Sequence, residues 1–267
     1  HYGSRLLFWT FIGFKSIFFT TFLAVTINQN KMKKLILTSL LFVTFSISAQ
    51  DFYWTYYNFS VEPKNEAAVL QLVQYYFKEH NQDGVTVRFF ENHFNDSGNN
   101  YTHSIGFSGT LDAMGNQYSG AQSDSWDLFL TRVNQLIKGS FSSFMGRGIS
   151  THGPATEGNV WPIQNYVYLH VKDPSAFLAA REKYFSSFKS DVRLTVLGSI
   201  TSGRSPHGET HMVIQGYKDF KSAMAGMDAL LTSDQVEARR KAWKEFSENN
   251  GGVSVIRSGT RILLGKW

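Results

Sequence analysis

Two stretches of this chain, residues 100–107 and 208–215, share one local pattern. Each reads as a β-strand that leaves a polar turn, and each carries the dipeptide Thr-His near its start. The two histidines, His103 and His211, are 108 positions apart. A fixed internal spacing is typical of a duplicated structural unit. The spacing therefore predicts that two copies of one fold follow each other along the chain.

The same spacing relates two segments with helical periodicity. In the first, side chains that suit a buried face recur at intervals of three and four residues, which indicates an amphipathic helix. They are Val69, Leu72, Val73, Tyr76, Phe77 and His80. The positions 108 residues later are Phe177, Ala180, Arg181, Tyr184, Phe185 and Phe188. Five of these six again suit a buried face, and we expect Arg181 to extend its charged end to solvent.

Strand-like runs surround each predicted helix in the order strand, helix, strand, strand. The aromatic run at residues 52–59 predicts a central strand covered on both faces, with a ring-lined ligand pocket as the alternative. Residues 111–123 read as an irregular insertion, and residues 141–149 as a short fourth strand. Residues 253–264 read as a hairpin that turns at Ser258-Gly259.

The N-terminal 49 residues predict a targeting segment. Two lysines follow Met32, then an apolar run and Ser48-Ala49-Gln50, which is the pattern of a secretory signal peptide over residues 32–49. Residues 1–31 are either sequence upstream of the true start at Met32 or a membrane helix over residues 6–27. We favour the first interpretation, because Lys15 would lie near the middle of that helix. The protein is thus expected to be secreted or periplasmic, without stable membrane insertion after processing.

Removal of residues 1–49 changes the charge of the chain. The whole sequence has 26 basic and 21 acidic residues, and the first 49 residues hold five basic residues and no acidic one. The remaining chain has a net charge of zero, so we expect no nucleic-acid partner. There is no cysteine, which excludes disulfides, thiolate metal sites and a cysteine nucleophile.

The predicted organisation is an α+β chain with a first unit at residues 50–150, a linker at residues 151–164 and a second unit at residues 165–267. Two such units in succession resemble the ferredoxin-like modules of the dimeric α+β barrel group. That group includes antibiotic-biosynthesis-type monooxygenases and haem proteins similar to chlorite dismutase. The resemblance implies two fused ferredoxin-like units whose sheets form a barrel with helices outside. It rests on element order and the repeat, so it transfers no functional residue.

One candidate metal site follows from strand pairing. If the first hairpin turns at Gly98, His93 lies opposite His103, with Glu91 on the same face. Two histidines and a carboxylate suit a divalent metal. The alternative is that these groups are hydrogen-bonded or exposed near a hairpin tip. No phosphate-binding loop, zinc-protease helix, calcium loop or serine-hydrolase elbow occurs.

The two Thr-His histidines are the candidate ligand-binding residues, His103 and His211. Because duplicated halves need not both keep a site, we expect one histidine to face a pocket and the other to be packed, and His103 is our choice for the first role. The predicted function is binding of a small apolar or aromatic molecule or a partner. The alternative is a monooxygenase-like or haem-dependent enzyme, and the sequence leaves the cofactor open.

Overall fold

The computed structural model describes residues 52–95, 101–119, 123–154, 161–204 and 207–267. These residues belong to one compact unit. The predicted signal peptide at residues 32–49 and the upstream residues 1–31 lie outside the described residues. Among the described residues, no helix has the length and apolar character needed to cross a membrane.

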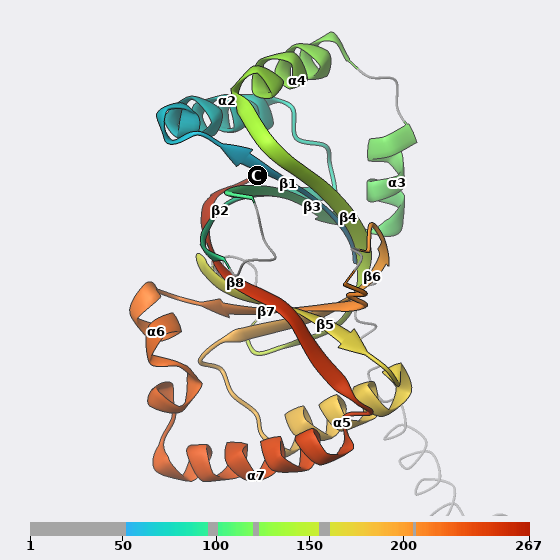
Figure 1. The fold of residues 1–267 in the computed structure, drawn as a ribbon, viewed down its shortest axis with the longest axis vertical. Coiled ribbons are helices and arrows are strands. Elements are labelled where there is room, and N and C mark those ends of the chain that lie inside the picture. Colours follow the sequence, from blue (N-terminus) through green and yellow to red (C-terminus); the bar gives the residue numbers. More distant parts are fainter. Residues whose placement is uncertain (1–51, 96–100, 120–122, 155–160, 205–206) are drawn as a thin grey trace, which may run out of the picture. The chain divides into compact units, whose positions relative to one another are not determined.

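The elements follow one another in two similar series (Figure 1). The first series is β1 (Tyr53–Val61), the 3-10 turn η1 (Pro63–Asn65), α2 (Glu66–Glu79), β2 (Val85–Asn95), β3 (His103–Gly109), α3 (Leu111–Ser119), α4 (Asp124–Leu136) and β4 (Ile137–His152). The second is β5 (Ile163–Val171), α5 (Pro174–Ser187), β6 (Leu194–Ser202), β7 (His211–Tyr217), α6 (Phe220–Ala225), η2 (Met227–Leu230), α7 (Ser233–Asn249) and β8 (Val253–Lys266). His103 and His211 begin equivalent strands, as the repeat predicts.

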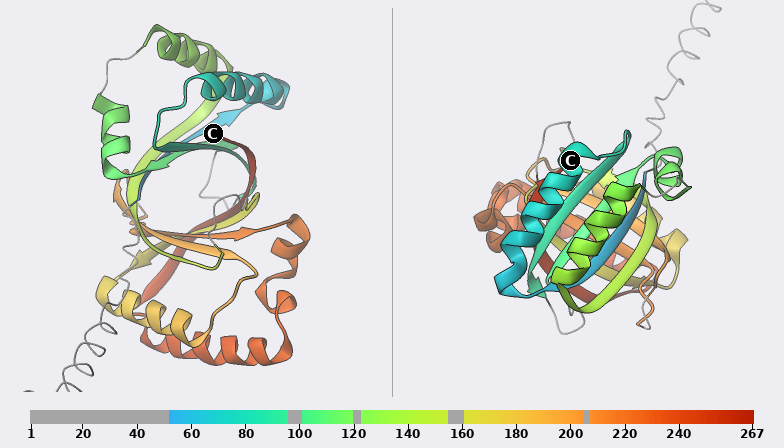
Figure 2. Two further views of the ribbon diagram at one scale, coloured as in Figure 1. Left: turned by 180° about the vertical axis from the view of Figure 1, so that it is seen from behind. Right: turned by 90° about the horizontal axis from the view of Figure 1, so that it is seen from above.

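All eight strands form one closed antiparallel barrel in the order β1-β3-β2-β8-β5-β7-β6-β4. The two last strands join the halves. β4 pairs with β1 of its own half and with β6 of the other, whereas β8 pairs with β5 and with β2. The helices cover the outside of this barrel, α2 and α4 on one half and α5 and α7 on the other (Figures 1 and 2). The predicted fold class, two ferredoxin-like units in an α+β barrel, is therefore confirmed.

Alternation along the strands separates an outer core from the barrel interior. On β1, Tyr57 and Phe59 pack toward the helices of the first half, whereas Trp54 and Tyr56 belong to the cluster inside the barrel. The aromatic run at residues 52–59 thus forms a strand covered on both faces, as predicted. The second half has its own outer core, which includes Phe177 on α5 and Leu197 on β6.

Three local predictions were wrong. Residues 111–119 form the helix α3, which buries Met114 and begins with the hydroxyl of Thr110 accepting from the amide of Ala113. β4 has 16 residues because both of its edges find partner strands. β8 continues through Ser258-Gly259 without a turn, and Gly259 leaves room for the hydroxyl of Tyr166, which would lie 2.4 Å from an added Cβ.

Candidate functional site

The two Thr-His histidines have the same packed surroundings. The side chains of His103 and His211 are 2% and 6% exposed. In each copy the histidine Nδ1 lies 2.8 Å from the hydroxyl of the preceding threonine. That hydroxyl also accepts a backbone N–H, from Val61 in the first copy and from Val171 in the second. The expected contrast between one packed and one pocket-facing histidine is absent, and their ligand role stays a prediction.

The register of the first hairpin differs from the one predicted. Glu91, and not His93, lies opposite His103. His93 and Glu91 form an ion pair at 3.0 Å near the surface, while the imidazole of His103 stacks against Phe59 and Phe89. Among the described residues, no three potential ligands gather as a metal site. The metal role of Glu91, His93 and His103 therefore stays a prediction without support from this geometry.

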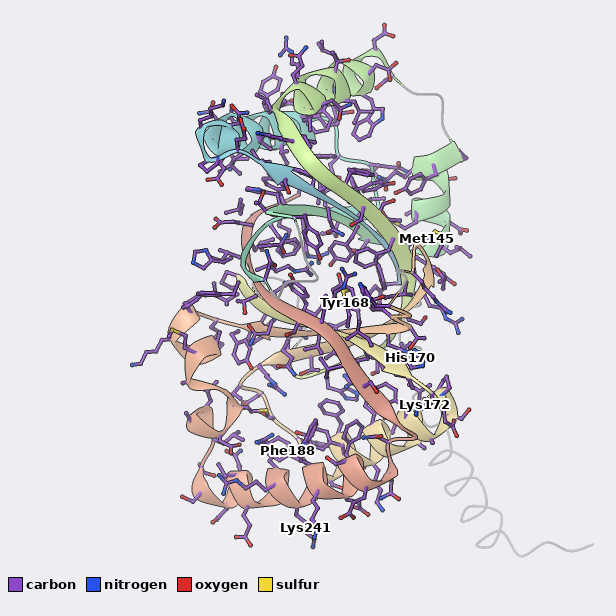
Figure 3. The ribbon with its side chains drawn as sticks, in the orientation of Figure 1. Met145, Tyr168, His170, Lys172, Phe188 and Lys241 are labelled. Carbon is purple, nitrogen blue, oxygen red and sulfur yellow. The ribbon has the colours of Figure 1, made fainter. Side chains whose placement is uncertain are left out.

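Large aromatic side chains occupy the barrel interior. Trp54, Tyr56, Phe90, Phe144, Tyr166 and Tyr168 are all buried there, and Tyr168 lies in the middle of the barrel in Figure 3. Burial raises the pKa of the Tyr166 and Tyr168 hydroxyls, so both stay protonated at neutral pH.

Two arginines of β8 enter this aromatic interior. Arg261 is 3% exposed and donates to the side-chain oxygens of Tyr56 and Gln164, at 2.9 Å and 2.9–3.0 Å. Its guanidinium lies 3.9 Å from the ring centroid of Phe90, close enough for a cation–π interaction. Arg257 pairs with the buried carboxylate of Glu209 at 2.9 Å. Arg257 is thus paired with a carboxylate, whereas Arg261 has neutral partners, Tyr56, Gln164 and the ring of Phe90.

A cavity of about 490 Å³ lies at the edge of the second half, where β4 and α5 end. We call it the second-half cavity; it is lined by Thr151, His152, Gly153, Phe185, Lys189, Ser190 and Asp191. Gly153 is required at this point, because its φ is +92° and an added Cβ would lie 2.1 Å from the carbonyl oxygen of Arg193.

His152 is the histidine of this cavity. Its ring stacks on Phe185, with centroids 3.7 Å apart and planes 7° from parallel. Its Nε2 lies 3.7 Å from a carboxylate oxygen of Glu182. Burial, and then the charge of Arg181, lower the pKa of His152, and Glu182 opposes them. The imidazole is therefore neutral at pH 7 and can accept a proton.

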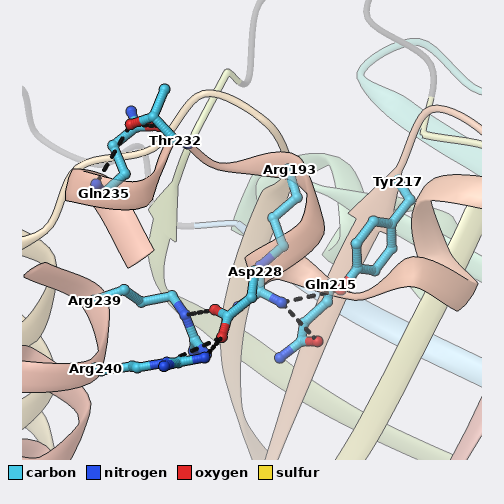
Figure 4. Close-up of polar contacts among 8 residues, drawn as sticks. All are labelled: Arg193, Gln215, Tyr217, Asp228, Thr232, Gln235, Arg239 and Arg240. Atoms are coloured by element: carbon cyan, nitrogen blue, oxygen red, sulfur yellow. Dashed lines mark hydrogen bonds and ion pairs between the residues drawn. The ribbon is translucent and has the colours of Figure 1, made fainter. Parts of the chain in front are cut away.

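Two arginines lie in the layer between α5 and the sheet, next to the cavity. Arg181 is 7% exposed, and its guanidinium lies 4.8 Å from the ring centroid of Phe185. Burial lowers its pKa to about 10. The expectation that Arg181 reaches solvent was wrong. Arg193, immediately before β6, donates through Nη1 to the side chains of Gln215 and Tyr217, at 3.1 and 3.0 Å (Figure 4).

Three nitrogen atoms of this layer are buried without a hydrogen-bond partner among the described residues. They are Nε2 of His152, Nη2 of Arg181 and Nε of Arg193. The charge of Arg193 contributes to the lowered pKa of Arg181, so the two cations lie close enough to repel each other. Buried donors are normally paired in a folded protein.

The first half carries apolar side chains at the equivalent positions. Three pairs follow from the 108-residue spacing. The fourth follows from strand pairing: Trp267 hydrogen-bonds to the backbone of Val87, and His152 pairs with Thr195, which is the residue 108 positions after Val87. The matched pairs are Val73 and Arg181, Val85 and Arg193, Phe77 and Phe185, and Trp267 and His152. Val73 and Val85 are buried, and the Trp267 ring packs 6.1 Å from Phe77. The same fold is therefore built without the polar layer.

Reasoning from the sequence selected the histidines that recur, His103 and His211, and their ligand role stays a prediction. It did not single out the polar groups beside the second-half cavity. The one sequence signal for them was Arg181, the one charged residue among six matched helix positions. His152 carried no such signal, because the predicted fourth strand ended before it.

Comparison with known proteins identifies the fold alone. No protein-family model matches the chain, and no curated protein matches it. Solved structures do match. A candidate monooxygenase from Fusobacterium nucleatum has 16% identity and a TM-score of 0.55, covering 82% of this chain and 94% of its own. A candidate monooxygenase from Lactobacillus acidophilus has 10% identity and a TM-score of 0.54, with 80% and 95% covered.

A third similar structure is an anthrone oxidase-like protein. It has 11% identity and a TM-score of 0.51, and covers 82% of this chain and 93% of its own. All three matches extend over most of both chains. The chain therefore has the dimeric α+β barrel fold, with both modules fused in one polypeptide.

Proposed function

We propose that this chain binds a small aromatic molecule in the second-half cavity and removes a proton from it, as the first step of an oxygenation that uses no bound cofactor. The observation that carries the proposal is the neutral imidazole of His152 at an open cavity. Catalytic bases act best when they are unprotonated at the working pH and lie beside bound substrate. The names of the similar structures, monooxygenase and anthrone oxidase-like, favour this class of reaction.

The surroundings of His152 fit a flat, weakly acidic substrate. Phe185 lines the cavity, where His152 stacks on its ring and the guanidinium of Arg181 lies 4.8 Å from its centroid. A substrate ring would therefore meet the edge of Phe185, in a T-shaped contact. The positive charge of Arg181 already acts on His152, as the lowered pKa of the imidazole indicates. The same charge stabilises an anion that forms when a substrate loses its proton.

The reaction balances with dioxygen as the only co-reactant. An aromatic compound with an acidic methylene group, such as anthrone, gives a proton to His152 and becomes an electron-rich carbanion. The carbanion supplies the electrons that reduce dioxygen. One oxygen atom becomes the new carbonyl oxygen, and the other leaves as water with the two methylene hydrogens.

The haem alternative does not fit this cavity. Haem iron is commonly held by an axial histidine whose nitrogen faces the metal. The ring face of His152 is covered by Phe185, and its Nε2 is buried beside Glu182. His103 and His211 are packed in the outer cores. We therefore derive no step through haem.

The test is dioxygen consumption by the purified protein with anthrone as substrate. His152→Gln is expected to lower kcat/KM by about 10²–10⁴ with unchanged thermal stability, because a positioned base contributes a factor of this size. His93→Gln is the matched control. His93 lies near the surface on β2, in the first half of the chain, whereas the cavity belongs to the second half. Equal rates in His152→Gln and the unaltered protein, or no uptake above buffer, would contradict the proposal.

The pH profile gives an independent check. Burial and Arg181 lower the pKa of His152 from its ordinary 6.5, whereas Glu182 raises it; Lys189 and Asp191 also line the cavity. The base is active when deprotonated, so kcat/KM should rise with pH, reach its midpoint below 6.5 and then level off. A midpoint well above 6.5 would exclude His152 as the base.

A further inference from the structure

We infer that the ligand of the second-half cavity carries a carboxylate, which binds the unpaired Nη2 of Arg181. This inference deepens the proposed function and rests on the same cavity. It adds to the proposed substrate a carboxylate on the aromatic ring, a group that anthrone lacks. The starting observation is that Nη2 of Arg181, a side chain only 7% exposed, has no hydrogen-bond partner among the described residues.

These charges are unnecessary for the fold. The first half builds the same strand and helix arrangement with Val73, Val85 and Trp267 at the corresponding places. A buried guanidinium is costly when its donors are left unpaired. The carboxylate of Glu182 acts on Arg181, yet Nη2 of Arg181 has no partner among the described residues. A bound anion at this atom would compensate the remaining cost.

The donor set selects a planar oxyanion. The guanidinium fork of arginine matches a carboxylate through two parallel hydrogen bonds. The Arg181 Nε already contacts the hydroxyl of Ser150 at 3.4 Å, which leaves Nη2 available for the ligand. Phe185 adds an aromatic wall beside the same guanidinium. A carboxylate attached directly to an aromatic ring satisfies both groups at once.

Access requires movement of one side chain. The unpaired donors have no exposed surface, and His152 covers Phe185 at the cavity floor. Arg181 is not among the residues that line the cavity, so the inference requires the His152 ring to move away from Phe185 when the ligand binds. At the cavity, the ammonium group of Lys189 attracts the approaching anion, and the carboxylate of Asp191 opposes this attraction.

The experiment uses two probes of similar shape, 4-fluorobenzoate and 4-fluorobenzamide, followed by ¹⁹F NMR at pH 7.5 in the full chain. The amide is uncharged and has an NH₂ donor in place of one carboxylate oxygen. The carboxylate should bind, and the amide should bind at least tenfold more weakly. Arg181→Val installs the residue of the first half, and Arg181→Met keeps a longer stem. Each should weaken 4-fluorobenzoate about ten- to hundredfold, the range for hydrogen bonds to a charged group.

Lys241→Gln is the charge-matched control. Lys241 is exposed on α7 and points away from the barrel (Figure 3), so this change should leave binding within about twofold. Thermal melting separates the two roles of Arg181. Loss of binding with an equal or higher melting temperature supports the inference. Loss of binding with a lower melting temperature in both Arg181 variants would assign the residue to the fold and overturn it.

Failure of the carboxylate site and failure of the proposed oxygenase give different results. Binding of 4-fluorobenzoate that depends on Arg181, without dioxygen uptake, would refute the oxygenase and keep the carboxylate site. Dioxygen uptake that depends on His152, with equal binding of acid and amide, would keep the oxygenase and overturn the carboxylate site.

Discussion

At the residue scale, the same amino acid has two different roles in this chain. His103 and His211 are buried, and burial lowers the pKa of each. Both contact a threonine hydroxyl that also accepts a strand amide. This arrangement fixes the start of β3 and of β7 against the neighbouring strand. His152, by contrast, lies at a cavity, and its Nε2 has no hydrogen-bond partner among the described residues.

We predict that His103→Ala and His211→Ala lower the free energy of unfolding by similar amounts, about 1–3 kcal/mol each. The reason is that each change removes a buried hydrogen bond and packed ring atoms. Urea denaturation measures the loss, and binding of 4-fluorobenzoate to the folded variants should be unchanged. A selective loss of binding in His103→Ala at unaltered stability would restore the site predicted from the sequence.

At the element scale, β4 depends on glycines that make room for aromatic rings. A Cβ on Gly146 would lie 2.0 Å from the carbonyl oxygen of Ser199 and 2.3 Å from the ring of Trp54. Trp54 itself is 4% exposed inside the barrel. The glycine and the tryptophan therefore form one packed unit across neighbouring strands, in the way that small and large side chains alternate in narrow barrels.

We predict that Gly146→Ala destabilises the protein by about 3 kcal/mol, at the upper end for overpacked cores, because neither the β6 backbone nor Trp54 can move aside. Gly115→Ala is the control. An added Cβ there meets nothing within 4 Å, and the residue lies in helix α3. It should stabilise the protein by roughly 0.5–1 kcal/mol. The measurement is the melting temperature of each variant. Equal melting temperatures for Gly146→Ala and Gly115→Ala would refute this account of β4.

The helices were predictable because their signals are local. Asp173 and Ser123 each accept the N–H of the residue three positions on, and Thr232 and Gln235 form a capping box, the pattern Thr-x-x-Gln in the sequence. The lengths of β4 and β8 were not predictable in this way. Their hydrogen-bond partners come from the opposite half, and glycine within them marks a close packing contact, where the sequence pattern indicates a turn.

At the scale of the whole molecule, duplication gives symmetric architecture with unequal contents. The barrel order follows from two copies of one unit whose last strands reach the other half. The repeat in the sequence predicted the two copies, and the family resemblance implied the barrel, but the reach of the last strands into the other half was not predicted. The location of the polar layer was not predictable, because it depends on which residues of β4, α5 and β6 meet beneath one cavity. Only the three-dimensional pairing brings His152, Arg181 and Arg193 into one layer.

The central claim is that the second half, and not the first, holds the ligand. Titration of ¹⁵N-labelled protein with 4-fluorobenzoate tests it directly through changes in backbone amide chemical shifts. The account predicts that the largest changes cluster at His152, Gly153 and residues 185–191, with the first-half counterparts Phe77, Val85 and Trp267 unaffected. Changes centred on Trp267, or on Arg261 in the barrel interior, would contradict it.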